Sequence, residues 1–212
     1  VNTAPALFVL GLACTMVIAP PAVVCRVYIE TRYVESWYSD PVLELAILGF
    51  LAEGPVHGYE LRKRIEHLSG FARVVSDGSL YPAIKRLERD GLITRTLVPG
   101  SAASQRHELR ITDDGVVALH AMLRGADGQD VSDFNRFIVV LAFLSQLPDE
   151  QERAKVLRRR LEFLAQPGSF FYDGDVPRRE ADMTDPYRRG MFVVARAHSR
   201  AERAWLREML AN

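Results

Sequence analysis

Residues 76–93 show a marked separation of hydrophobic and polar positions. At 3.6 residues per turn, one face of a helix here collects only apolar side chains, namely Leu80, Ala83, Ile84 and Leu87. The opposite face carries three cations with an aromatic ring on its flank, namely Lys85, Arg86, Arg89 and Tyr81. One side of this helix is therefore expected to be buried, while the other offers positive charge to a partner.

Capping residues mark both ends of this helix. Ser76, Asp77 and Ser79 are all suited to accept hydrogen bonds from the first free backbone N–H groups. Pro82 costs little only in the first turn, because an earlier start would lose one hydrogen bond at the proline and bend the helix. We therefore expect Ser79 to be the N-cap and Asp90-Gly91 to end the helix.

Shorter patterned segments on either side complete a known layout. We expect an apolar helix at 41–53 after the cap Asp40 and a second helix at 57–69. The pattern then changes to two short strands at 92–98 and 106–111, joined by small residues, and Thr112 caps a fourth helix. Three helices and a two-stranded hairpin are typical of a winged helix-turn-helix. In that fold the third helix enters the major groove and the hairpin, or wing, lies against the DNA backbone.

The second half of the sequence predicts helices, so the fold class is mainly α. Segments 132–147, 148–166 and 187–210 carry apolar residues on one side or at alternating spacings of three and four, which is typical of a coiled-coil seam. These helices have more apolar face than one chain of this size covers, so we expect a homodimer. The candidate dimerisation residues are Phe137, Leu141, Leu157, Leu161, Leu164, Met191, His198 and Trp205.

The first 40 residues differ from the rest. Residues 4–24 contain no charge and are about long enough to cross a bilayer, but prolines interrupt them and no Lys or Arg precedes them. We expect residues 1–40 to be an extension from a misplaced start site or a segment without order. A membrane tether is the alternative. The predicted parts are then this extension, a winged-helix DNA-binding domain at 41–124 and a helical dimerisation domain at 125–212.

Composition narrows the classes of function. Lys and Arg total 27, as do Asp and Glu, so positive charge for nucleic acid has to come from one local face. Cys14 and Cys25 lack the spacing of a zinc site or disulfide framework, which favours a reducing, cytoplasmic location. There is no glycine-rich phosphate loop, H-E-x-x-H or nucleophile elbow, and the five histidines are scattered. We therefore expect no enzyme activity, no metal and no cofactor.

Three motifs resemble the PadR family of transcriptional regulators. They are G-P-V-H-G-Y-E-L at Gly54–Leu61, S-L-Y-P-A-I at Ser79–Ile84 and I-T-D-D-G at Ile111–Gly115, within a match of about residues 42–123. The resemblance implies a dimeric winged-helix repressor whose C-terminal helices form the dimer. The longer C-terminal region is similar to that of the virulence-activator-type subgroup.

The hairpin departs from the family pattern. The family's return strand is usually basic and rich in aromatic residues, whereas this one reads Q-R-H-E-L-R from Gln105 to Arg110, and the tip at 100–104 carries no charge. Wing contact with phosphate therefore rests on Arg106 and His107.

These features predict sequence-specific binding to double-stranded DNA at a pseudo-palindromic site. Arginine can bond guanine with two parallel hydrogen bonds and lysine supplies charge to phosphate, so the principal candidates are Lys85, Arg86 and Arg89. Further candidate contacts are Ser79, Tyr81 and Arg106. Two alternatives remain: Arg86 has Asp90 as an i+4 ion-pair partner, and Tyr81 is placed to pack on the second helix.

Other functions and partners remain open at this point. A winged helix used only for protein binding would not need three outward cations, and a membrane-anchored regulator would use residues 4–24. A small aromatic effector is a candidate ligand, because Phe134, Phe137, Phe163 and Trp205 gather on the C-terminal helices. A dimer core is the more ordinary explanation of these aromatic residues.

Overall fold

The computed structural model describes residues 41–68, 76–98, 106–166, 172–173 and 176–211. Our predictions for residues 1–40, including the membrane tether, lie outside these ranges. Across the described ranges, no helix is both long enough and apolar enough to cross a membrane. The described residues all belong to one compact unit, and the domain boundary near residue 124 stays a prediction.

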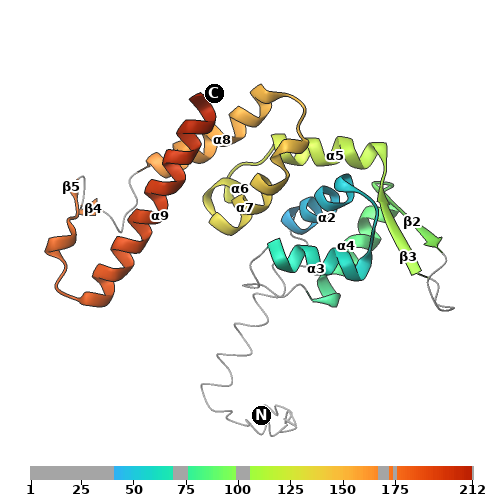
Figure 1. Ribbon diagram of the computed structural model, residues 1–212, viewed down its shortest axis with the longest axis horizontal. Helices are drawn as coiled ribbons and strands as arrows, with labels where there is room; N and C mark the ends of the chain where they lie inside the picture. The colour runs from blue at the N-terminus through green and yellow to red at the C-terminus, as the bar shows by residue number, and fades with distance from the viewer. Residues whose placement is uncertain (1–40, 69–75, 99–105, 167–171, 174–175, 212) are drawn as a thin grey trace, which may run out of the picture. The chain divides into compact units, whose positions relative to one another are not determined.

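The N-terminal part is a winged helix (Figure 1). Its elements are α2 (Pro41–Glu53), β1 (Val56–His57), α3 (Gly58–Leu68), α4 (Asp77–Arg89), β2 (Ile93–Val98), β3 (Arg106–Ile111) and α5 (Asp113–Arg124). The helices and both predicted strands lie within one or two residues of their expected positions at most ends. The predicted Thr112 cap of α5 is also confirmed, because its Oγ1 accepts a hydrogen bond from the backbone N–H of Gly115 at 3.0 Å.

The sheet has three strands rather than the two expected. The short strand β1 pairs antiparallel with β3, with Val56 opposite Leu109, so the strand order is β1-β3-β2. A strand of two residues is too short to show the alternation from which a strand is predicted. By pairing with β3, β1 joins the turn before α3 directly to the wing.

Helix α2 is the centre of the core. It is apolar nearly all round and contacts α3, α4, α5, α7 and β3. At Gly49 the ring of Phe143 from α7 comes so close that an added Cβ atom would lie 2.4 Å from it. The same ring meets Phe50 edge to face, with centroids 4.9 Å apart. Only glycine permits this contact between α2 and α7.

The start of α4 corrects one prediction. Ser76, not Ser79, is the N-cap: its Oγ accepts from the backbone N–H of Ser79 at 3.2 Å, and the helix begins at Asp77. Pro82 therefore lies inside the helix rather than in its first turn, and the helix lacks one backbone hydrogen bond at this proline. The prediction failed because the buried Ser79 hydroxyl adds a second bond to Ser76, 2.8 Å long, and the stripe beginning at Leu80 fixes the helix against the core.

The C-terminal part is helical, as predicted. Its elements are α6 (Gln129–Ser132), α7 (Phe134–Phe143), the 3-10 turn η1 (Leu144–Gln146), α8 (Glu150–Ala165), the short strands β4 (Tyr172–Asp173) and β5 (Val176–Pro177), the 3-10 turn η3 (Glu180–Asp182) and α9 (Pro186–Ala211). The one helix expected at 132–147 is divided, because the Asp133 carboxylate accepts from the backbone N–H groups of Asn135 and Arg136 and starts α7 anew.

A buried arginine joins three of these helices. Arg160 of α8 is 2% exposed and donates to both carboxylate oxygens of Glu202 on α9, at 2.6 and 3.0 Å. It also donates to the carbonyl oxygens of Val131 at 2.6 Å and Ser132 at 3.2 Å, on α6. No local sequence pattern marks this arginine as buried, since its partners Val131, Ser132 and Glu202 are distant in the chain.

Candidate nucleic-acid interface

The two faces of α4 differ as the sequence predicts. All four residues of the apolar face are at most 2% exposed, namely Leu80, Ala83, Ile84 and Leu87. On the other side Tyr81, Lys85 and Arg89, spaced four residues apart, are exposed; we call these three residues the α4 stripe. The buried face therefore fixes α4 against the core, while the α4 stripe faces solvent.

The two cations of the α4 stripe differ in how firmly they are held. Within the described ranges, the Lys85 side chain has no hydrogen bond or ion pair. Arg89 donates to its neighbour Asp90 at 2.9 Å, and this hydrogen bond raises the pKa of Arg89 above its ordinary value. Because the Arg89 pair is exposed, its contribution to stability is small. Both side chains are therefore free to turn toward an anionic partner.

Arg86 is placed differently from the other two cations. Its guanidinium donates twice to the Glu44 carboxylate of α2, at 3.0 and 2.9 Å, and its side chain is 29% exposed. The partner expected from the sequence was Asp90. Glu44 lies 42 residues away, so no local spacing reveals it. In the described structure Arg86 ties α4 to α2.

The two hydroxyl residues at the start of α4 also differ. Ser79 is 6% exposed and bonded to Ser76, which argues against the DNA contact predicted for it. Tyr81 is 43% exposed, and its ring lies beside Gly58 of α3, with Cε1 3.5 Å from where a Cβ atom would stand. Tyr81 therefore packs on the second helix, which was one of its two predicted roles. Its ring also keeps an exposed edge, and the DNA contact stays a prediction.

The wing brings further charges close to α4. Arg95 of β2 forms an ion pair with Glu88 of α4 at 3.2 Å, and its buried Nε has no hydrogen-bond partner among the described residues. Arg95 is not among the residues predicted from the sequence, although strand alternation sets it on the same face as the buried Ile93. The side chain of Arg106 and the tip of the hairpin lie outside the described residues, and the phosphate contact of Arg106 stays a prediction.

Comparison with known proteins bears on this arrangement. Residues 47–121 match the sequence model of the transcriptional regulator PadR-like family. Among curated proteins, the negative transcriptional regulator PadR of Bacillus subtilis (strain 168) is 28% identical over 122 residues, which are 57% of this chain and 66% of that protein. The chain belongs to the PadR-like family of transcriptional regulators. This confirms the resemblance found in the motifs, while the virulence-activator-type subgroup stays a prediction.

Solved structures of PadR-like proteins match different shares of this chain. A PadR-like regulator from Bacillus cereus strain ATCC 14579 is 35% identical, over 38% of this chain and 76% of that one, with a TM-score of 0.34. Bacillus subtilis PadR in complex with operator DNA is 21% identical, over 80% of this chain and 98% of that one, with a TM-score of 0.40. TM-scores below 0.5 do not establish a shared overall arrangement.

The candidate dimerisation residues of this PadR-like regulator fall into two groups. Phe137 and Leu157 are at most 5% exposed and lie in the core of the single chain, which argues against an intermolecular role. Leu141, Leu161 and Leu164 are half-buried. The exposed members are Met191, His198 and Trp205, all on α9.

Helix α9 has two adjacent apolar faces. Phe192 and Leu206 are buried within the chain, where α9 packs on α8. The second face follows the predicted spacing of three and four and stays exposed. We call it the α9 seam, and it consists of Tyr187, Met191, Val194, His198, Ala201 and Trp205.

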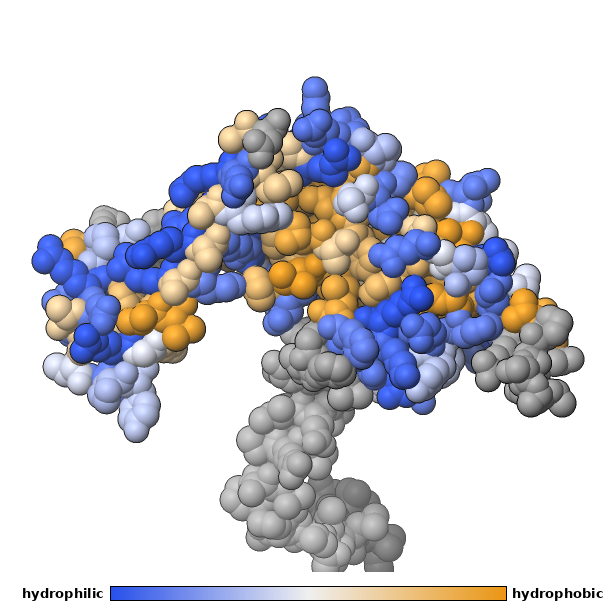
Figure 2. Space-filling view, viewed as in Figure 1, coloured by the Kyte–Doolittle hydropathy of each residue, from blue (hydrophilic) through white to orange (hydrophobic). Residues whose placement is uncertain are grey.

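In Figure 2 hydrophilic residues predominate over α3, whereas apolar residues gather over α2 and α7.

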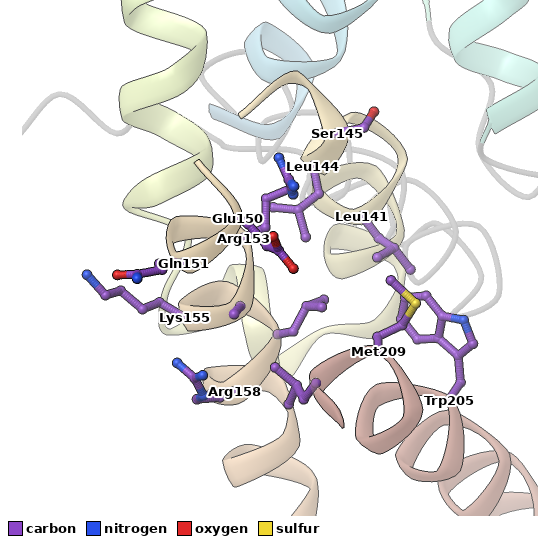
Figure 3. Close-up of a pocket in the computed structure, with 13 residues that line it drawn as sticks. Leu141, Leu144, Ser145, Glu150, Gln151, Arg153, Lys155, Arg158, Trp205 and Met209 are labelled. Atoms are coloured by element: carbon purple, nitrogen blue, oxygen red, sulfur yellow. The ribbon is translucent and has the colours of Figure 1, made fainter. Parts of the chain in front are cut away.

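A cavity of about 940 Å³ opens beside the end of the α9 seam (Figure 3). Trp205 and Met209 stand on α9 at one side of it, and Lys155 and Arg158 stand on α8 at the other. Leucines such as Leu141 line its inner side. The lining therefore combines apolar side chains with three cations, Arg153, Lys155 and Arg158, and one carboxylate, Glu150.

Proposed function

We propose that this PadR-like regulator is a cytoplasmic repressor that binds a pseudo-palindromic operator as a homodimer. The observation that carries the proposal is the α4 stripe, exposed on a helix whose other face is entirely buried in a winged helix. Two such helices related by a two-fold axis meet half-sites about one helical turn apart.

We assign different roles to the residues of α4. Lys85 and Arg89 supply charge to phosphates and bases, Tyr81 donates to a phosphate, and Arg106 of the wing adds a further phosphate contact. Arg86 is a positioning residue, because its bonds to Glu44 orient α4 on the core. Ser79 completes the cap with Ser76 and touches no DNA in this assignment.

The test begins with recovery of bound sequences from fragmented genomic DNA, which yields the operator. Binding of the Lys85→Ala variant to the operator and to a scrambled duplex is then measured across a range of salt. A phosphate contact contributes through counterion release, so the variant should weaken binding to both duplexes alike and lower the salt slope by about one unit. Unchanged binding would favour a winged helix that contacts protein instead.

We propose that the α9 seam forms the homodimer. It has the heptad spacing of a two-stranded seam, and its Val194 is 69% exposed in the single chain. An exposed valine on a regular apolar stripe is best covered by a second copy of the same stripe. A dimer held in this way also supplies the two-fold axis that the operator model requires.

A matched pair of variants tests the seam. Val194→Asp places a charge on the seam and should give monomers in light scattering. Val193→Asp makes the same change one residue away, where the side chain points off the seam and is 41% exposed, and should leave the dimer intact. A dimer that persists in Val194→Asp shows that the contact lies elsewhere. The substitution Leu157→Asp is unsuitable, because that side chain is buried within the chain.

We propose that a small aromatic effector binds in the cavity beside Trp205 and releases the operator. The volume, the apolar side chains and the excess of cations over the single carboxylate Glu150 fit an aromatic acid. Bacillus subtilis PadR has been solved in complex with p-coumaric acid, which makes this compound a suitable probe. It should quench tryptophan fluorescence and lower operator affinity, and the Trp205→Phe variant should lose both responses.

A further inference from the structure

A second cavity, of about 670 Å³, lies between the first turn of α3, the helix α4 and the sheet. We call it the wing cavity; its lining includes His57, Tyr59, Tyr81, Arg95, His107 and Leu109. All three strands and both helices of the helix-turn-helix contribute to it. No residue of the α9 seam lines it, so it is separate from the cavity beside Trp205.

Arg95 gives the wing cavity a cation that is only partly satisfied. It stands opposite Leu109 across the β2–β3 ladder, and both residues line the cavity. Its single ion pair, to Glu88, is 3.2 Å long, and its Nε is buried without a partner in the described part of the chain. A buried donor without an acceptor is unfavourable, so this side chain gains by turning to a new anion.

Other groups around Arg95 fit an anion as well. The Tyr81 hydroxyl lies 4.0 Å from the Cβ position of Gly58, which places this donor beside the first turn of α3. Free backbone N–H groups at a helix start favour negative charge. The carboxylate of Glu60, which also lines the cavity, is held by Arg64 at 3.3 Å. His57 Nδ1 donates to the carbonyl oxygen of His107 at 3.0 Å and fixes β1 to β3.

The position of the cavity decides which anion reaches it. Tyr81 belongs both to the α4 stripe and to the lining of the wing cavity. When the third helix of a winged helix lies in the major groove and the hairpin lies against the backbone, a phosphate strand passes between them. That space is where the wing cavity is found.

We propose that the wing cavity seats one backbone phosphate of the bound DNA, with Arg95 as its charge partner and the Tyr81 hydroxyl as a second donor. The inference rests on the proposed DNA binding and adds to it a contact outside the third helix. A phosphate contact of this kind fixes the register of the protein on the duplex and reads no base.

The experiment compares two arginines of the same sheet. Arg95→Gln removes the charge from the wing cavity. Arg110→Gln removes one from β3 at a position whose side chain points to the opposite face of the sheet, where Arg110 is 53% exposed and paired with Glu108. Both variants and the unmodified protein are titrated with a labelled operator duplex and with a scrambled duplex over a range of salt. Thermal melts establish that each variant is folded.

Arg95→Gln should weaken binding to both duplexes alike and lower the salt slope by about one unit, whereas Arg110→Gln should leave the slope unchanged. Tyr81→Phe keeps the ring and serves if Arg95→Gln does not fold; it should weaken binding about fivefold to tenfold. A neutral methylphosphonate at the seated phosphate of the operator should weaken the unmodified protein and have no further effect on Arg95→Gln.

Three results overturn the inference without touching the proposed function. The first is an unchanged salt slope in Arg95→Gln while Lys85→Ala still binds more weakly. The second is an equal fall of the salt slope in Arg95→Gln and Arg110→Gln, which indicates that the overall positive charge of the sheet, and not one seated phosphate, sets the slope. The third is binding of p-coumaric acid that requires Arg95 while the DNA slope stays intact. Absence of DNA binding by the unmodified protein would instead refute the proposed function.

Discussion

Removal of the buried cation at position 160 should destabilise the C-terminal helices strongly. The Arg160→Met variant keeps much of the side-chain volume but leaves the Glu202 carboxylate, 10% exposed, without its partner. Breaking a buried ion pair in this way costs about 3–5 kcal/mol. The carbonyl oxygens of Val131 and Ser132 also lose a donor, at about 1 kcal/mol each, so we expect a total loss of about 5–7 kcal/mol.

A double variant separates the free-energy cost of the unpaired Glu202 carboxylate from the cost of the lost hydrogen bonds. Arg160→Met combined with Glu202→Met removes both charges, so the loss should fall to about 1–3 kcal/mol, from the two carbonyls alone. The free energy of unfolding is measured by urea denaturation at one fixed protein concentration, because a dimer's stability depends on concentration. Arg158→Met, at an exposed neighbouring arginine, is the control and should change little.

A double variant whose loss equals the sum of the losses of the single variants Arg160→Met and Glu202→Met would refute this expectation. Additive losses would mean that Arg160 and Glu202 stabilise the fold independently of each other. A loss of less than about 1 kcal/mol in Arg160→Met would also refute it, since an unpaired buried carboxylate would then cost little here.

Two further substitutions test contacts of α2. Gly49→Ala should destabilise the fold by about 1–3 kcal/mol in urea denaturation, because the new methyl group meets the Phe143 ring; a neutral result would show that α7 yields easily. Glu44→Gln should weaken its bonds to Arg86 and reduce operator affinity more than affinity for a scrambled duplex, because α4 is less firmly oriented. Equal reduction on both duplexes would contradict the positioning role of Arg86.

Local sequence patterns predicted the elements of this chain well. The stripe from Leu80 to Leu87 is buried as expected, because four apolar residues on one helical face have only one way to leave water. The same reasoning located both strands of the hairpin, the Thr112 cap and the long last helix. The family was also evident from short motifs around the turn at Gly54–Leu61.

What the sequence did not predict depends on contacts between distant residues. Glu44 and Arg86 are far apart in the chain, as are Arg160 and Glu202, so their pairing has no local signal. Phe137 looked like an interface residue because helical spacing shows that a side chain is buried, but not whether its own chain or a second copy covers it. Burial by the same chain became visible only in three dimensions.

The central position of α2 has a mechanical consequence. Glu44 grips α4 through Arg86, while Gly49, less than two helical turns further on, receives the ring of Phe143 from α7. Because α2 contacts both α4 and α7, we expect a displacement of α7 to shift α2 and, through the bonds between Glu44 and Arg86, to shift α4. Such a shift would couple the C-terminal helices to the α4 stripe through contacts within one chain.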